Sequence, residues 1–76
     1  MISYYKFHDS YFKLDSEKTF FSQVNNSTNQ KAIIYGGVSP VIEALHSSKI
    51  KDSWLEVTED EFNTVKLEVL NTLSAI

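Results

Sequence analysis

Residues 53–62 read S-W-L-E-V-T-E-D-E-F and join a short strand to the start of a helix. Residues 53–57 predict the strand, and Thr58 with Glu61 matches a capping box, in which the threonine hydroxyl accepts a hydrogen bond from the Glu61 amide. The three acids in this first turn also favour a helix start, because they complement the positive end of the helix dipole. Apolar residues then recur at helical spacing and predict a C-terminal helix whose inner stripe is Phe62, Val65, Val69 and Leu73, widened by Leu70 and Ile76.

The residues before this segment predict a sheet followed by a first helix. Ser39 can cap that helix and Pro40 suits its first position, so we expect it to run to about Ser47, with Val41, Ile42, Ala44 and Leu45 facing the core. Residues 25–30 (N-N-S-T-N-Q) predict a polar loop between the third and fourth strands. The four predicted strands cover residues 2–7, 11–14, 19–24 and 31–35. The pattern indicates a single α+β domain over residues 1–76: a small antiparallel β-meander of about four strands, then a helix, a short strand and a C-terminal helix.

Composition excludes several classes of ligand. The chain has no cysteine, a formal net charge of −3, and lysine as its only strongly basic residue type. Because arginine supplies the planar fork that suits phosphates and base edges, its absence in an acidic chain argues against nucleic acid. No apolar run approaches the roughly 20 residues of a membrane span, and the N-terminus lacks the pattern of a signal peptide. We therefore expect no membrane association and a location in the cytoplasm.

No group of residues predicts catalysis or a cofactor. His8 and Asp9 are neighbours in a strand or turn and would point apart, while His46 and Ser47 are neighbours in a helix and do not face each other. The pair Gly36-Gly37 stands between a strand and a helix, where backbone amides can hold phosphate, but the loop lacks a third glycine and a Lys-Ser/Thr pair, and a tight turn explains it fully. We expect a protein with no enzymatic activity, metal, cofactor or small-molecule substrate.

The predicted sheet carries large apolar side chains on both of its faces. Two helices can cover one face of a small sheet but not readily both, so the second face either curls into the core or receives another chain. We place Tyr4, Tyr11 and Phe21 on this second face. Trp54 is expected to anchor the core between the fifth strand and the last helix.

The segment Trp54 to Phe62 resembles the strand and capped helix that end many small proteins of tailed bacteriophages and their bacterial hosts. The lysine-only, asparagine-rich composition resembles coding from an AT-rich genome, which suits such a source. The resemblance implies a place among virion accessory proteins or small host-directed inhibitors, and hence a location in the cytoplasm of a host cell or in a virion. It transfers no functional residue.

The leading interpretation is a non-enzymatic structural or interaction protein. It would dock onto itself or onto a larger assembly, for example as a capsid or tail component of a phage. The expected contacts are Tyr4, Tyr11 and Phe21 on the sheet, with Asn25, Asn26 and Asn29 in the polar loop. The alternative is a small acidic inhibitor or regulator that binds a basic site on a host enzyme or nucleic-acid-binding protein. Salt would weaken that binding sharply, whereas apolar docking would resist it.

Overall fold

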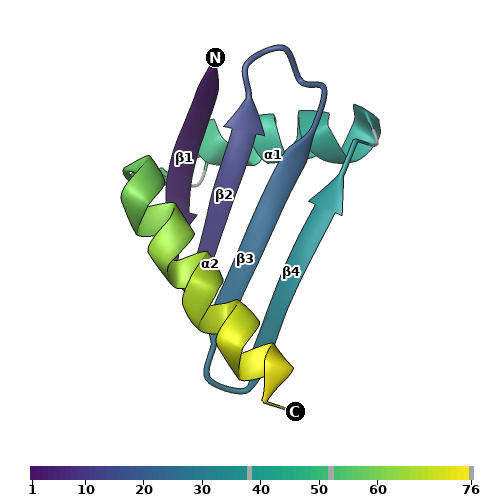
Figure 1. Cartoon of the computed structure of the whole chain (residues 1–76). Helices are drawn as coiled ribbons and strands as arrows, with labels where there is room; N and C mark the ends of the chain where they lie inside the picture. Colours follow the sequence, from purple (N-terminus) through teal and green to yellow (C-terminus); the bar gives the residue numbers. More distant parts are fainter. Residues whose placement is uncertain (38, 52, 76) are drawn as a thin grey trace.

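A computed structural model describes residues 1–37, 39–51 and 53–75. Four strands, a helix, a fifth strand and a second helix follow one another along the chain (Figure 1). This order confirms the predicted α+β fold, with an antiparallel sheet followed by a helix, a short strand and a C-terminal helix. The elements are β1 (Ile2–Phe7), β2 (Ser10–Asp15), β3 (Phe21–Ser27), β4 (Gln30–Gly36), α1 (Ser39–Lys51), β5 (Leu55–Glu56) and α2 (Glu59–Ser74).

The sheet is a meander with the spatial order β4-β3-β2-β1-β5, and all of its neighbouring strands are antiparallel. β3 runs on to Ser27, which pairs with Gln30, so that only Thr28 and Asn29 form the turn to β4. The prediction of a polar loop over residues 25–30 is therefore wrong. Polar residues can continue the strand here because hydrogen bonds to β4 pair their backbone N–H and C=O groups.

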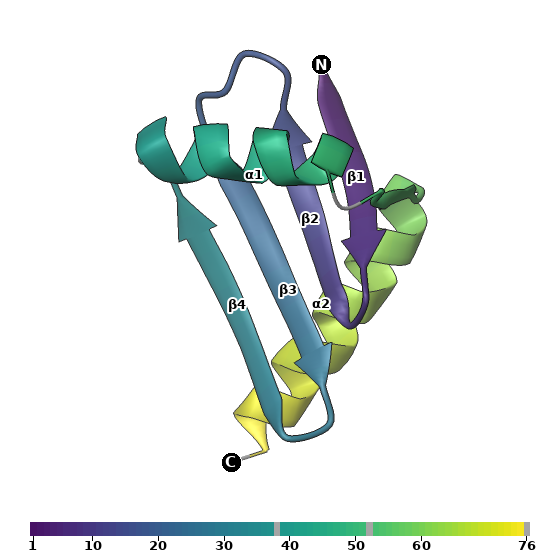
Figure 2. The ribbon, with the colours of Figure 1, turned by 180° about the vertical axis from the view of Figure 1, so that it is seen from behind.

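The two helices lie on opposite faces of the sheet. α1 runs across the strands behind the sheet of Figure 1 and in front of it in Figure 2, whereas α2 lies on the other side. We call these surfaces the α1 face and the α2 face. The molecule therefore has three layers, with the sheet in the middle. The expectation that two helices leave one face uncovered is wrong, because each helix covers a face of its own.

β5 explains how the chain changes faces. Its two residues pair with Tyr5 and Lys6 of β1, at the edge of the sheet. Trp54, just before β5, packs into the core cluster under α1, and Val57, just after it, packs against the cluster under α2. The chain thus leaves α1 on one side, lies in the plane of the sheet for one short strand, and enters α2 on the other side.

A local signal sets the start of α2, and the inner faces of both helices differ in part from the prediction. The Thr58 hydroxyl accepts from the Glu61 amide at 3.1 Å, as the capping pattern predicts. α1 continues to Lys51 and turns Ile42 fully inward, but Val41 is 43% exposed. The predicted inner stripe of α2 is also too wide, since Leu73 is 38% exposed. Ile76 lies outside the described residues.

Two small clusters of buried side chains, one on each face, make up the core. On the α2 face they are Tyr11, Val24, Phe62, Val65 and Val69. On the α1 face they are Phe12, Leu14, Phe21 and Ile42. The pairing of Tyr11 with Val24 and of Leu14 with Phe21 keeps each cluster on one side, because side chains directly opposite in a ladder share a face.

Gly36 is the point where β4 makes room for the core. It pairs with Phe21, and a β-carbon at position 36 would lie 2.5 Å from Cε1 of that ring. The ring is buried against Leu14 and Ile42, so it has little room to move away. Gly36 is thus required by packing, whereas its sequence context predicted only a turn.

We expect Gly36→Ala to lower the free energy of unfolding by about 1–3 kcal/mol, because it overpacks the ring of Phe21. Urea denaturation measures this cost. In a Phe21→Leu background the same substitution should cost less than half as much, since the obstructing ring carbon is gone. Equal costs in the two backgrounds would contradict this explanation.

Candidate functional site

Tyr4 and Tyr11 both lie on the α2 face, beneath the helix. Tyr11 is only 9% exposed and belongs to the core, in a cluster with Phe62. Tyr4 is half-buried, its ring centre lies 5.4 Å from that of Phe62, and its hydroxyl donates to Glu59 Oε2 at 2.8 Å. Burial, followed by the hydrogen bond to Glu59 and the negative charge of that residue, raises the pKa of Tyr4 above its usual value.

Phe21 lies on the other face of the sheet. It pairs with Leu14 and is 7% exposed beneath α1. The expectation that Tyr4, Tyr11 and Phe21 form one exposed surface is therefore wrong in two respects. They do not share a face, and a helix covers each of the two faces on which they lie.

The asparagine residues are divided between a strand and a turn. Asn25 and Asn26 belong to β3, and only Asn29 lies in the exposed turn. Asn26 Oδ1 accepts from Lys31 Nζ at 2.6 Å, and Asn25 Oδ1 accepts from the Ser27 amide at 3.2 Å. These hydrogen bonds stabilise the hairpin. Of the three asparagines, Asn29 is the one that lies exposed in the turn.

Trp54 packs on the α1 face, and its predicted place between β5 and α2 is wrong. Its ring stacks on Phe12 with the centres 4.1 Å apart, and it lies 6.0 Å from Phe7. The indole Nε1 is buried and has no hydrogen-bond partner within the described ranges. The side chain points to this face because Trp54 precedes the crossing of the chain at β5.

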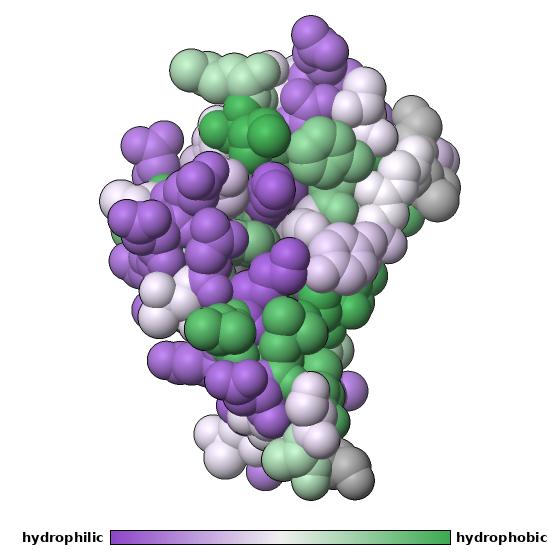
Figure 3. All heavy atoms as spheres, in the orientation of Figure 1, coloured by the Kyte–Doolittle hydropathy of each residue, from purple (hydrophilic) through white to green (hydrophobic). Residues whose placement is uncertain are grey.

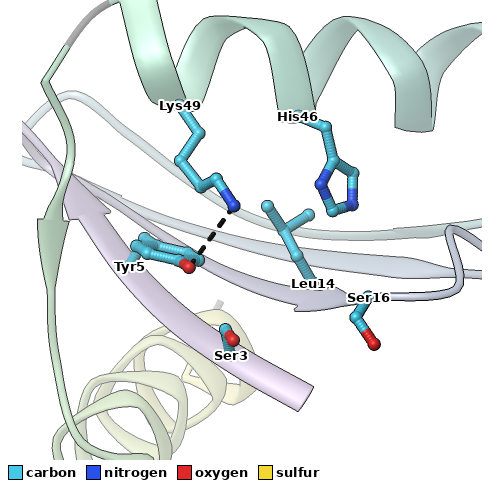
Figure 4. A pocket seen from close by; sticks show the side chains of 6 residues that line it. All are labelled: Ser3, Tyr5, Leu14, Ser16, His46 and Lys49. Atoms are coloured by element: carbon cyan, nitrogen blue, oxygen red, sulfur yellow. Dashed lines mark hydrogen bonds between the residues drawn. The ribbon is translucent and has the colours of Figure 1, made fainter. Parts of the chain in front are cut away.

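A cavity of about 220 Å³ lies between α1 and the adjoining ends of β1 and β2. In Figure 4 the side chains of His46 and Lys49 descend from α1 towards Tyr5 and Leu14 on the sheet. Lys49 Nζ lies 3.4 Å from the Tyr5 hydroxyl and 4.9 Å from the centre of its ring. The remaining lining residues are Ser3 and Ser16. The sequence raised His46 only as a neighbour of Ser47 and gave Lys49 no place in a site, since the convergence of these residues with β1 and β2 depends on tertiary structure.

The two edges of the sheet differ in length and character. β5 closes one edge with two residues. β4 forms the other edge over seven residues and pairs only with β3 among the described strands. Ile34 is 45% exposed and Tyr35 is 61% exposed, on opposite sides of this strand. The sequence predicted β4 but gave no sign that it would stand at an edge.

Exposed apolar side chains of α2 continue the surface beside β4. Lys66 Nζ lies 5.3 Å above the Tyr35 ring, so this flank of the helix faces β4. Leu70 and Leu73 follow Lys66 at i+4 and i+7 on the same flank, and they are 41% and 38% exposed. Figure 3 shows hydrophobic side chains gathered over the C-terminal half of α2 and beside it. We use the name β4 surface for this edge, with Ile34 on its α1 side and Tyr35, Leu70 and Leu73 on its α2 side.

A second hollow of about 500 Å³ borders the β4 surface and is lined by residues that include Tyr35, Gly36 and Lys66. Within residues 1–37, 39–51 and 53–75, no three side chains of histidine, aspartate or glutamate gather as metal ligands. No helix of these segments has the length and apolar character needed to cross a bilayer. Comparisons with protein-family models, curated proteins and solved structures found no match. The cavity under α1, and the β4 surface with its adjoining hollow, are therefore the candidates that the geometry offers.

We expect Tyr11→Ala to lower the free energy of unfolding by about 3–5 kcal/mol, as for other large aromatic residues truncated in a core. Tyr35→Ala removes the same atoms from an exposed position and should cost less than about 1 kcal/mol. Urea denaturation of both variants tests the placement of the two rings. Similar costs for the two would contradict it.

Asp15 holds the turn between β2 and β3 and should make stability depend on pH. Its carboxylate accepts from the Thr19 hydroxyl and, at 3.3 Å each, from the amides of Glu17 and Thr19. The hydrogen bond from the Thr19 hydroxyl is the main reason why the pKa of Asp15 lies below its usual value. Because the folded pKa is lowered, the stabilisation is present above the unfolded pKa and is lost as the pH falls through the folded pKa.

Asp15→Asn should therefore reduce the free energy of unfolding at pH 7, and the difference from wild type should shrink below about pH 4. Urea denaturation at pH 7 and pH 3 measures both values. Glu68→Gln, which removes an exposed carboxylate on α2, serves as the control for net charge. An Asp15→Asn effect of equal size at both pH values would refute the assignment.

Proposed function

We propose that this chain is a non-enzymatic interaction protein that docks onto a second copy of itself through the β4 edge. The observation that carries the proposal is the contrast between the two edges of the sheet. An unpaired edge offers a row of backbone donors and acceptors to any extended chain. Soluble proteins usually protect such an edge with a short strand, a charged residue, a proline or a bulge. β5 has only two residues and offers little backbone for pairing, whereas β4 has seven residues.

β4 lacks the usual protective devices in its central part. Residues 32–35 (A-I-I-Y) contain neither proline nor charge, and the pairing with β3 runs without a bulge from Ser27↔Gln30 to Phe21↔Gly36. Lys31 is the one charged residue of the strand, and the Asn26 carbonyl engages its ammonium group. The edge is therefore regular, apolar and able to accept another strand.

A second copy is the occupant that suits this edge. Two antiparallel β4 strands related by a two-fold axis present identical surfaces to each other, which gives a closed dimer with one continuous sheet. Such a dimer would bring the exposed side chains of Ile34 and Tyr35 close to those of the partner. Leu70 and Leu73 on α2 would then contribute apolar area beside the strand pair.

The same edge can also add the chain to a larger assembly. Strand addition uses backbone hydrogen bonds, so it does not require the partner to be a copy of this protein. In this form the chain would act as an accessory component of a phage capsid or tail, in keeping with the resemblance of residues 54–62. The self-association described above is the simplest form of the proposal.

The acidic surface at the other edge favours a second candidate function, that of an acidic regulator. Glu56, Glu59, Asp60 and Glu61 are all exposed and follow one another from β5 into the first turn of α2. A basic site on a host enzyme or nucleic-acid-binding protein would complement this group of charges. Such binding should weaken steeply with ionic strength, whereas β4 pairing should change little.

We expect sedimentation velocity of the wild-type protein to show a monomer–dimer equilibrium that depends on concentration. Ile34→Lys should abolish the dimer, because a two-fold pair would bring the new charges near each other across the strand pair. Leu55→Lys is the matched control, since Leu55 is 66% exposed on the opposite edge. This variant should dimerise like wild type.

A wild-type protein that stays monomeric up to its solubility limit would contradict self-association through β4. Loss of the dimer in Leu55→Lys but not in Ile34→Lys would assign the contact to the β5 edge instead. The urea midpoint of each variant confirms that the folded monomer is intact, because both positions are exposed.

A further inference from the structure

The cavity under α1 has the size of a site for a small ion. Its volume of about 220 Å³ is below the range of about 300–1,000 Å³ that is typical of pockets for drug-sized ligands. Residues from three elements line it: Ser3 and Tyr5 from β1, Leu14 from β2, and His46 and Lys49 from α1, with Ser16 just after β2. Groups from different directions can therefore contact one small ligand at several of its atoms.

The lining is rich in hydrogen-bond donors. The Tyr5 hydroxyl oxygen accepts from Lys49 Nζ at 3.4 Å, so its own hydrogen remains available. Ser16 Oγ likewise accepts from the Met1 nitrogen at 3.2 Å and keeps its hydrogen for donation. Lys49 adds up to three donors and a positive charge at the same place. Such a group is suited to a ligand that accepts hydrogen bonds and carries negative charge.

His46 supplies an independent observation. Its Nε2 atom is buried and has no hydrogen-bond partner in the described part of the chain. The side chain extends from α1 towards the cavity (Figure 4). Buried polar atoms are nearly always paired, and His46 is one of the residues that line the cavity, so the cavity is the place where a ligand can supply the missing partner. A bound oxygen acceptor would pair with Nε2 when this nitrogen carries its hydrogen.

The charge around the cavity is opposite to that of the protein as a whole. The chain has a net charge of −3, yet no carboxylate lines the cavity. Of the acids close to the lining residues in the sequence, Asp15 accepts from the Thr19 amide, and Glu43 forms an ion pair with Lys18 at 3.2 Å. We propose that this cavity binds a small phosphate-like oxyanion, held by Lys49, His46 and the hydroxyls of Ser3, Tyr5 and Ser16.

NMR titration of the folded protein with inorganic phosphate tests the proposal. Sodium chloride keeps the ionic strength constant, and a parallel titration with glycerol phosphate tests whether an ester is also accepted. We expect saturable shifts of the amide signals of Ser3, Tyr5, Ser16 and Lys49 with at least one of the two ligands. Lys49→Met should weaken this binding by at least about tenfold, because it removes a charge-assisted hydrogen bond.

Lys51→Met is the matched control, since it removes the same charge from an exposed position two residues further along α1. It should bind phosphate like wild type. His46→Phe should also weaken binding, and it provides a second test if Lys49→Met fails to fold. Shifts that are absent, that never saturate, or that fall equally in Lys49→Met and Lys51→Met would overturn the proposal and leave a cavity filled by water alone.

Discussion

The pairing of β5 with β1 is the constraint on which the architecture depends. Only Leu55 and Glu56 take part, opposite Lys6 and Tyr5. Because successive residues of a strand point to opposite faces, these few residues can lead the chain from one side of the sheet to the other. Without this contact nothing in the local sequence would prevent α2 from packing beside α1. The three-layer structure therefore follows from one short strand at an edge.

Covering both faces decides where a partner can bind. The rings on the sheet are used inside the molecule, with Tyr11 beneath α2 and Phe21 beneath α1. β4 is left as the long edge, with apolar side chains on both of its sides. The helix that seals the α1 face also creates the cavity bordered by His46 and Lys49. Both candidate sites are thus consequences of the way in which the helices are divided between the faces.

Local sequence patterns predicted the elements well but could not predict how the elements are placed. The capping pattern at Thr58 and the turn residues His8 and Asp9 act over a few residues, so the sequence alone reveals them. The face on which Phe21 lies depends instead on its pairing with Leu14, seven positions away, and no local pattern encodes that register. The same holds for the cavity, whose lining joins residues 3–16 to His46 and Lys49, at least 30 positions further along the chain. Trp54 was misplaced for this reason: its neighbours along the chain predict contact with α2, but its neighbours in space are Phe12 and Phe7.

The most direct test of the division of the helices between the faces is a set of nuclear Overhauser effects at the crossing point. The structure predicts strong effects between the rings of Trp54 and Phe12, and between those of Tyr4 and Phe62. It predicts none between Trp54 and Phe62, which lie on opposite sides of the sheet. Effects between Trp54 and Phe62, with none between Trp54 and Phe12, would place Trp54 on the α2 face and contradict the crossing of the chain at β5.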